Sequence, residues 1–176
     1  MRRPLWLVFL AASVLTIAWP AASSATAPNN ASNSYMFFME VPNSAQDSAG
    51  DTLSVTGEGT FGVHPKSASG GGEFTFTAAD GTHFSGTWTV NGLIAFQPYG
   101  CGVIFGTPIP PDLCGGRVVL DITATTPFGL QKAQLTIYCE IGSPPPSTEE
   151  GITAVVPSVG SFSRQTGGMN VYVKSS

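Results

Sequence analysis

Charged side chains are scarce in this sequence. Asp, Glu, Lys and Arg together make up 10% of the 176 residues, whereas an ordinary soluble domain carries roughly 25%. The chain has 7 basic against 11 acidic residues, so it lacks the basic surface with which proteins neutralise nucleic-acid phosphates. It also lacks the charged repeats of a coiled coil and the charge-rich composition of a disordered tail. We therefore expect no nucleic-acid partner and a globular domain with a nearly neutral surface.

Amphipathic helices are a second absence. No window of about a dozen residues carries an apolar period near 3.6. Glycine and proline, by contrast, are abundant, with 21 and 14 residues, and both favour turns and strands over long helices. The composition thus favours a β-rich fold.

The first 25 residues predict a secretory signal peptide. Two arginines precede an uncharged apolar stretch at 5–19, which is shorter than the roughly 20 residues of a membrane-spanning helix. Small residues follow, completing the three-part pattern of a cleavable export signal, and we place the cleavage after Ala25. The mature protein is therefore expected to be secreted or periplasmic, with no membrane span and with a flexible polar arm at 26–34.

Residues 35–176 alternate apolar with small polar side chains, which is the pattern of half-buried strands. Glycine or proline lies near the ends of the runs. We expect strands at 35–41, 52–64, 73–78, 83–90, 93–99, 118–123, 133–141, 152–156 and 169–173. Gly57 and Gly59 occupy apolar positions of the second strand, which indicates a bend or bulge there.

Three short segments predict turns between these strands. Ser69–Gly72 is rich in glycine, while Asp80-Gly81 and Asn91-Gly92 are dipeptides of two-residue hairpins, whose backbone needs positive φ at both positions. Two such hairpins in succession make an antiparallel meander. The length suits one domain, so the sequence predicts a single-domain all-β fold of about eight to nine strands, either a β-barrel or a β-sandwich.

An odd number of cysteines in an exported protein leaves one thiol without an intramolecular partner. Cys101 and Cys114 flank a proline-containing segment at 100–116 that we interpret as a long ordered loop, and a disulfide between them would fix it. Cys139 lies at an apolar position of its strand. We predict a Cys101–Cys114 disulfide and a reduced, buried Cys139.

Residues with catalytic or metal-binding chemistry are few and scattered. His64 and His83 lie on the polar faces of their strands, with no second ligand at a metal-binding spacing, and no Gly-x-Ser-x-Gly elbow is present. We therefore assign no catalytic residue, no metal site and no cofactor. Glu149-Glu150 is interpreted as part of a solvated loop; the alternative pairs it with Glu140 or Asp121 as a calcium or acid–base site.

Aromatic side chains gather in the central part of the chain. Core packing is their simplest role, but a barrel of about eight strands leaves an interior wide enough for one small molecule. The candidate ligand-binding residues are then Phe74, Phe76, Phe84, Trp88, Phe96 and Tyr99. Ser and Thr residues on the opposite faces provide either uncharged solubility or a contact surface for a polysaccharide or a protein.

Several short motifs resemble those of small exported prokaryotic proteins of unassigned function. The motifs are Gly57-x-Gly59-Thr60-Phe61, Gly70-Gly71-Gly72-Glu73-Phe74-Thr75-Phe76, Asp80-Gly81, Ser85-Gly86-Thr87-Trp88, Leu93-x-x-Phe96-x-x-Tyr99-Gly100 and Glu149-Glu150-Gly151-Ile152. The resemblance covers most of residues 57–156 and implies no catalytic residue, because none is assigned in that group. The Gly-x-Gly-x-Phe start before a glycine-rich segment also resembles the dirigent and allene oxide cyclase barrels.

The sequence thus predicts an exported, non-catalytic β domain that binds a small apolar molecule or a surface partner such as a cell-envelope component. One alternative is a cavity enzyme of the cyclase or isomerase type, which would act mainly by holding its substrate. An inward-pointing Glu58, His64 or Tyr99 would favour that enzyme, and the alternation places Glu58 and His64 outward. The other alternative is an envelope-associated structural protein that uses the Ser and Thr faces.

Overall fold

Alternating apolar and hydroxyl side chains give this protein a fold made of strands. The computed structural model describes residues 33–175, and the all-β class predicted from the alternation is confirmed for them. Within this range no helix is long and apolar enough to cross a membrane. The predicted signal peptide at 1–25 lies outside the described residues, as does most of the predicted arm at 26–34, and Ser34 already begins the first strand.

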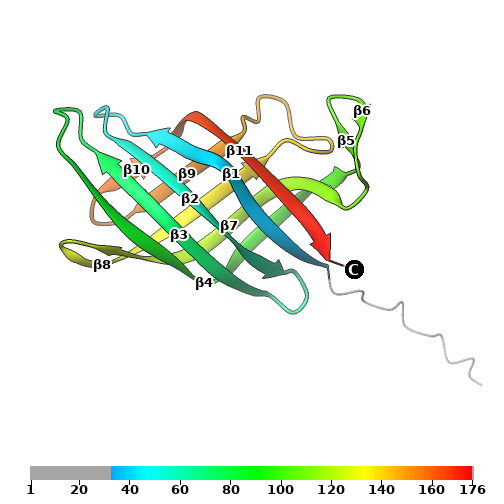
Figure 1. The fold of residues 1–176 in the computed structure, drawn as a ribbon, viewed down its shortest axis with the longest axis horizontal. Coiled ribbons are helices and arrows are strands. Elements are labelled where there is room, and N and C mark those ends of the chain that lie inside the picture. Colours follow the sequence, from blue (N-terminus) through cyan, green and yellow to red (C-terminus); the bar gives the residue numbers. More distant parts are fainter. Residues whose placement is uncertain (1–32, 176) are drawn as a thin grey trace, which may run out of the picture.

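Nine of the strands form one antiparallel sheet. They are β1 (Ser34–Gln46), β2 (Thr52–Gly62), β3 (Ser67–Thr77), β4 (His83–Cys101), β7 (Leu113–Thr126), β8 (Gly129–Cys139), β9 (Gly151–Val156), β10 (Gly160–Phe162) and β11 (Arg164–Ser175). The order in the sheet is β10-β9-β8-β7-β11-β1-β2-β3-β4, and β4 also pairs with β7. The remaining two strands, β5 (Val103–Ile104) and β6 (Thr107–Pro108), form a separate small hairpin, at the right of Figure 1.

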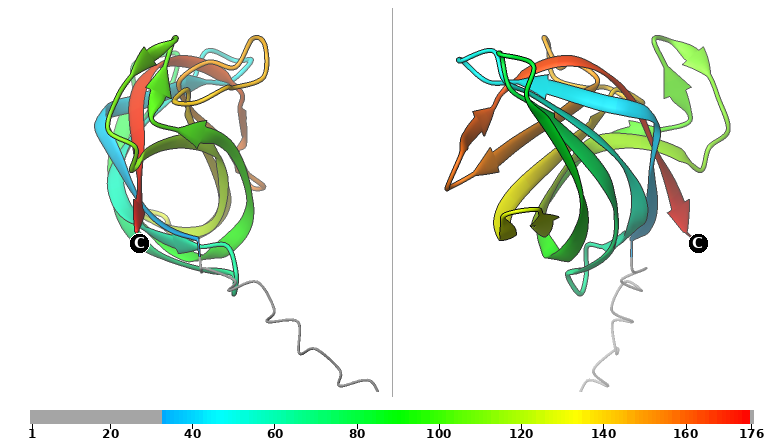
Figure 2. Two further views of the ribbon diagram at one scale, coloured as in Figure 1. Left: turned by 90° about the vertical axis from the view of Figure 1, so that its right-hand side faces the viewer. Right: turned by 60° about the vertical axis from the view of Figure 1, so that its left-hand side comes forward.

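β7 closes the sheet into a barrel. One edge of β7 pairs with β4 from Cys114 to Thr125. The other edge pairs first with β11, through Leu113 and Cys114, and then with β8, from Gly116 to Thr126. The closed ring β7-β11-β1-β2-β3-β4 contains six strands and is seen end-on in the left view of Figure 2. β8, β9 and β10 continue the wall beside this ring, where β9 also lies against β1 and β11.

The predicted hairpin at Asn91-Gly92 is wrong. These residues lie inside β4, which continues for 19 residues. The side chain of Asn91 exchanges hydrogen bonds with the Thr123 hydroxyl of β7, at 3.0 and 3.2 Å, and a bulge between Val90 and Gly92 adjusts the register. Because the chain does not reverse there, residues 93–99 lengthen the strand instead of folding back beside 83–90.

The predicted turn at Ser69–Gly72 is also wrong, because these residues belong to β3 and pair with Gly57–Thr60 of β2. The chain reverses earlier, at 63–66. A hairpin does form at Asp80-Gly81, but only Gly81 has a positive φ, of 89°. The connection is therefore longer than a two-residue turn, and Ala78 and Thr82 close it with a backbone hydrogen bond of 2.7 Å.

Glycines at inward positions of β2 leave room for aromatic rings. A Cβ atom at Gly57 would lie 2.5 Å from Cζ2 of Trp88, and one at Gly59 would lie 2.6 Å from Cε1 of Phe37. Both rings are almost fully buried, with centroids 6.5 Å apart. The two glycines therefore let aromatic rings lie directly against the backbone in the middle of the barrel.

Aromatic rings fill one end of the barrel. Tyr35 stacks on Phe61 with ring centroids 5.0 Å apart, and Phe96 packs against these two rings at 5.0 and 4.8 Å. Tyr172 of β11 stands edge-on to Phe61 at 5.6 Å, and its hydroxyl donates a hydrogen bond to the Ile137 carbonyl. We refer to Tyr35, Phe61, Phe96 and Tyr172 as the closed-end cluster.

The cysteines pair as the sequence predicts. Cys101 at the end of β4 is bonded to Cys114 of β7, which is also its partner in the strand register. Cys139 is free and fully buried, and its thiol donates to the Asn170 carbonyl at 3.0 Å. The segment 100–116, predicted as one long loop, instead holds the β5–β6 hairpin and the start of β7.

β1 is longer than the predicted strand, and β10 is a strand that the sequence does not predict. β1 continues beyond Val41 to Gln46. Val41 is 43% exposed although Phe37 and Met39, at alternating positions of the same strand, are buried, because register shifts in the β1–β11 pairing lie on both sides of Val41. β10 occupies Gly160–Phe162, where the sequence predicts no strand because three residues are too few to show alternation. The predicted strands at 118–123, 133–141, 152–156 and 169–173 overlap β7, β8, β9 and β11.

The Gly59→Ala substitution should lower the free energy of unfolding by about 2–3 kcal/mol, because overpacking costs roughly 1–3 kcal/mol and the added methyl meets both the Phe37 ring and the Ser69 carbonyl oxygen. The matched control is Gly92→Ala in β4, where a Cβ would have no neighbour within 4 Å. Urea denaturation of both variants measures the difference. Equal losses for Gly59→Ala and Gly92→Ala would contradict this account of the inward glycines.

Candidate functional site

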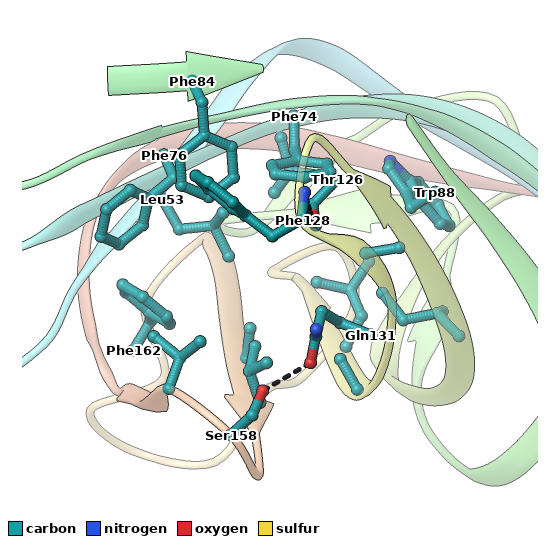
Figure 3. A pocket seen from close by; sticks show the side chains of 18 residues that line it. Leu53, Phe74, Phe76, Phe84, Trp88, Thr126, Phe128, Gln131, Ser158 and Phe162 are labelled. Carbon is teal, nitrogen blue, oxygen red and sulfur yellow. Dashed lines mark hydrogen bonds between the residues drawn. The ribbon is translucent and has the colours of Figure 1, made fainter. Parts of the chain in front are cut away.

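A cavity of about 270 Å³ occupies the end of the barrel opposite the closed-end cluster. Strands β2, β3, β4, β7, β8, β9 and β10 all contribute to its wall. It is lined by Leu53, Val55, Phe74, Phe76, Phe84, Trp88, Ile122, Ala124, Thr126, Phe128, Gln131, Ala133, Leu135, Ala154, Val156, Ser158, Val159 and Phe162. Figure 3 shows Phe76 and Phe84 on one side of the space, with Phe162 and Ser158 on the other.

Solvent reaches this cavity between the β7–β8 turn and the β9–β10 turn. Phe128, in the first of these turns, is 78% exposed, and Val159, in the second, is 56% exposed, although both line the cavity. Phe128 stands edge-on to Phe84, with centroids 5.3 Å apart. Large apolar side chains that stay exposed beside an opening are typical of a surface that binds a ligand or another protein. We refer to Phe128, Ser158, Val159 and Gln131 as the mouth of the cavity.

The cavity wall is apolar and uncharged. No Asp, Glu, Lys, Arg or His among the described residues lines it. The indole N–H of Trp88 donates to the Thr56 carbonyl at 3.0 Å, so it is satisfied within the wall. Thr126 is satisfied as well: its hydroxyl donates to the Gly129 carbonyl and accepts from the backbone N–H of Phe128.

One pair of polar side chains stands at the mouth. The Ser158 hydroxyl donates to the side-chain oxygen of Gln131 at 2.6 Å, as the dashed line in Figure 3 shows. This bond bridges β8 and the β9–β10 turn. The amide nitrogen of Gln131 donates to no group among the described residues. The mouth therefore offers an uncharged hydrogen-bond donor beside an apolar interior.

Of the six aromatic residues predicted as ligand-binding, Phe74, Phe76, Phe84 and Trp88 line the cavity. Phe96 does not, since it belongs to the closed-end cluster. Because β4 does not turn at Asn91-Gly92, Phe96 lies twelve residues beyond Phe84, roughly 40 Å along an extended strand.

Tyr99 is the second predicted residue outside the cavity. It is partly buried near the end of β4, and this burial raises the pKa of its hydroxyl, against the opposing effects of Thr148 and Arg117. Phe96 and Tyr99 therefore both lie outside the cavity wall.

Sequence reasoning missed Phe128 of the mouth and Phe162 of the cavity wall. Phe128 lies in a Pro-Phe-Gly turn, and Phe162 is the last residue of the three-residue strand β10. Neither belongs to a run of alternating residues, so periodicity gives them no signal. An aromatic residue in a turn sequence, where burial is not expected, is the one feature that would single out Phe128.

A second polar group lies inside the wall, away from the cavity. Asn43 and Asn170 are both buried, and the Asn170 amide donates to Asn43 Oδ1 at 2.8 Å and to the Tyr138 carbonyl at 2.9 Å. The Glu150 carboxylate accepts backbone N–H bonds from Asn170 at 2.6 Å and from Glu140 at 2.7 Å. These contacts join β1, β8 and β11 to the segment before β9.

The interpretation of Glu149-Glu150 as a solvated loop is therefore wrong for Glu150. Burial raises the pKa of this carboxyl to about 7, although the two backbone N–H donors oppose the shift. Burial also raises the pKa of the adjacent Cys139 thiol to about 12, with a further contribution from the Glu150 charge. Among the described residues no group of three or more His, Cys, Asp or Glu side chains is placed to hold a metal ion.

Comparison with known protein families, with characterised proteins and with solved structures found no match for this chain. The resemblance to small exported β proteins and to the dirigent and allene oxide cyclase barrels therefore stays a prediction. What the site does must be argued from its own geometry.

The stability contributed by Glu150 should fall as the pH rises from about 5 to 8. The folded protein binds this proton with a pKa of about 7, above the 4.5 of a free carboxyl, so the contribution is complete below pH 4.5 and is lost as the pH passes through 7. The thermal midpoint of the wild type should therefore decrease over this range relative to that of Glu150→Gln, which has no such proton. Glu149→Gln, at the exposed neighbouring position, should keep the wild-type profile. Parallel pH profiles for wild type and Glu150→Gln would contradict the assignment.

Proposed function

We propose that this protein is an exported binding module that holds one small apolar molecule inside its barrel. The observation that supports this proposal is the cavity of about 270 Å³ with an uncharged wall and an open mouth. Protein interiors are normally packed to the density of organic crystals, so an apolar space of this size that opens to solvent is the usual form of a small-molecule site. The Cys101–Cys114 disulfide is compatible with an oxidising location outside the cytosol.

The size of the cavity limits the size of the ligand. An engineered apolar cavity of about 150 Å³ binds benzene. By proportion, a cavity of about 270 Å³ suits a molecule of roughly ten to fifteen non-hydrogen atoms. Such a molecule would contact Trp88 at the inner end of the cavity and Phe128 at the mouth.

Binding remains a better proposal than the cavity enzyme considered as an alternative. That alternative gains support if Glu58, His64 or Tyr99 points into the interior. Glu58 and His64 are exposed, as the alternation predicts, and Tyr99 lies outside the cavity wall. No observation on the Ser and Thr faces favours the structural alternative over binding.

Trp88 makes the proposal directly measurable. The other two tryptophans, at positions 6 and 19, precede the described residues, so Trp6→Phe and Trp19→Phe leave Trp88 as the single tryptophan of the full chain. Titration with the fluorophore aminonaphthalene, which is neutral at pH 7 and within the size limit given above, should quench Trp88 emission by energy transfer, with saturation at one molecule per chain. Quenching that rises without saturation would contradict a single interior site.

Filling the cavity should weaken this binding about tenfold or more. Ala124→Leu places a larger side chain in the cavity wall, and forced overpacking costs roughly 1–3 kcal/mol, where about 1.4 kcal/mol is a factor of ten in affinity. The matched control is Ala95→Leu on β4, at an exposed position outside the cavity. Equal affinities for the two variants would place the fluorophore somewhere other than the interior.

A further inference from the structure

We infer that the natural ligand is a neutral, ring-containing molecule with one carbonyl or hydroxyl oxygen, which the Gln131 amide binds at the mouth. This inference rests on the proposed function and specifies the chemistry of the molecule bound. It depends on the electrostatics of the wall, the unpaired amide of Gln131 and the arrangement of the aromatic rings. Gln131 is then the residue that sets the orientation of the ligand.

The wall is unsuited to a charged ligand. A carboxylate or ammonium group loses its hydration when it enters an apolar space and needs a charged or multiply hydrogen-bonded partner in exchange. No lining side chain of the described part of the chain carries a charge. Lys132, next to Gln131 in β8, is exposed and lies on the opposite parity of the strand, outside the cavity. A fatty acid or an amine therefore finds no counter-charge in the wall.

Within residues 33–175, Gln131 provides the one open side-chain donor of the cavity wall. Its side-chain oxygen accepts from Ser158 at 2.6 Å, which holds the amide group in place and leaves its N–H₂ group on the far side from Ser158 (Figure 3). The other polar groups of the wall, on Thr126 and Trp88, are already paired. An oxygen acceptor on the ligand would complete the hydrogen bonding of Gln131, and a hydroxyl could do so as well as a carbonyl.

The aromatic side chains favour a flat ring system. Phe76 and Phe84 stack with centroids 5.1 Å apart, while Phe162 stands edge-on to Phe76 at 6.2 Å. The cavity lining therefore holds rings in two nearly perpendicular orientations, and another aromatic ring packs well either stacked on or edge-on to such rings. A branched or flexible aliphatic chain of the same size would make fewer stacked and edge-on contacts with these rings.

Three probes of almost equal shape separate these features. Acetylnaphthalene carries a ring system and one carbonyl oxygen, isopropenylnaphthalene replaces that oxygen by carbon, and naphthoate replaces the acetyl group by a carboxylate. Each competes with aminonaphthalene for Trp88 quenching in the chain described above. We expect acetylnaphthalene to bind about two- to tenfold tighter than isopropenylnaphthalene, as one neutral hydrogen bond provides. We expect naphthoate to bind at least about tenfold more weakly than acetylnaphthalene.

A pair of variants in β8 locates the donor. Gln131→Met keeps the length of the side chain and removes the amide, so the preference for acetylnaphthalene over isopropenylnaphthalene should disappear while isopropenylnaphthalene still binds. Gln134→Met makes the same change at an exposed position of the same strand, on the outer face, and should keep the wild-type preference. The comparison of the three probes in the unmodified cavity tests the inference even where a variant fails to fold.

The outcomes distinguish this inference from the function on which it rests. If acetylnaphthalene and isopropenylnaphthalene bind equally, or naphthoate binds as well as acetylnaphthalene, the inference is overturned while the interior site stands. A preference that survives Gln131→Met, or that Gln134→Met also removes, overturns the role of Gln131. If none of the probes, including aminonaphthalene, reaches the cavity, the proposed function itself is overturned.

Discussion

A β-strand has two edges for hydrogen bonding, and β7 has three partners, so the fold depends on how it shares them. Its first edge belongs to β4, and its second passes from β11 to β8 within a few residues of Cys114. Buried backbone N–H and C=O groups must be paired, so once β11 leaves this edge another strand has to replace it. The ring therefore closes at one end and spreads at the other. β8, β9 and β10 cover the spread side, and the cavity is the space that this arrangement leaves between them and β2, β3 and β4.

Aromatic residues have different roles at the two ends of the barrel. At the closed end, Tyr35, Phe61, Phe96 and Tyr172 contact one another and fill the interior. At the open end, Phe76, Phe84 and Phe162 also pack in pairs, but as a lining around an unfilled space. Between them, Phe37 and Trp88 lie against the bare backbone of Gly59 and Gly57. The inward glycines thus leave room for large rings in the middle of a narrow barrel. A side chain at Gly57 or Gly59 would clash with the ring of Trp88 or Phe37.

Alternation in the sequence predicted the class of fold, most of the strands and the inward faces of β2, β3 and the first half of β4, because a half-buried strand has a period of two. The prediction from alternation failed where the same dipeptide can form either a hairpin turn or a continuous strand. Asn91-Gly92 is a favourable hairpin dipeptide, yet in the folded chain Asn91 bonds to Thr123 of a strand 32 residues away, a contact that no local pattern reveals. Because β4 continues through Asn91-Gly92, Phe96 lies in the closed-end cluster and outside the cavity wall. Phe128 of the mouth, Phe162 of the cavity wall and the partly buried Glu150 lie in turns or very short strands, where tertiary contacts alone determine burial.

The position of the disulfide has a consequence for the unfolded chain. Cys101 and Cys114 are partners in the register of β4 and β7, and they are separated by 13 positions. A crosslink over a loop of about 15 residues removes conformational entropy equivalent to roughly 3 kcal/mol from the denatured ensemble. In the oxidised chain, β4 and β7 remain tethered at one matched pair even when every other contact is lost. Refolding can then begin from that pair and extend along both strands toward the mouth, so a crosslink at the closed end specifies the alignment of the wall at the open end.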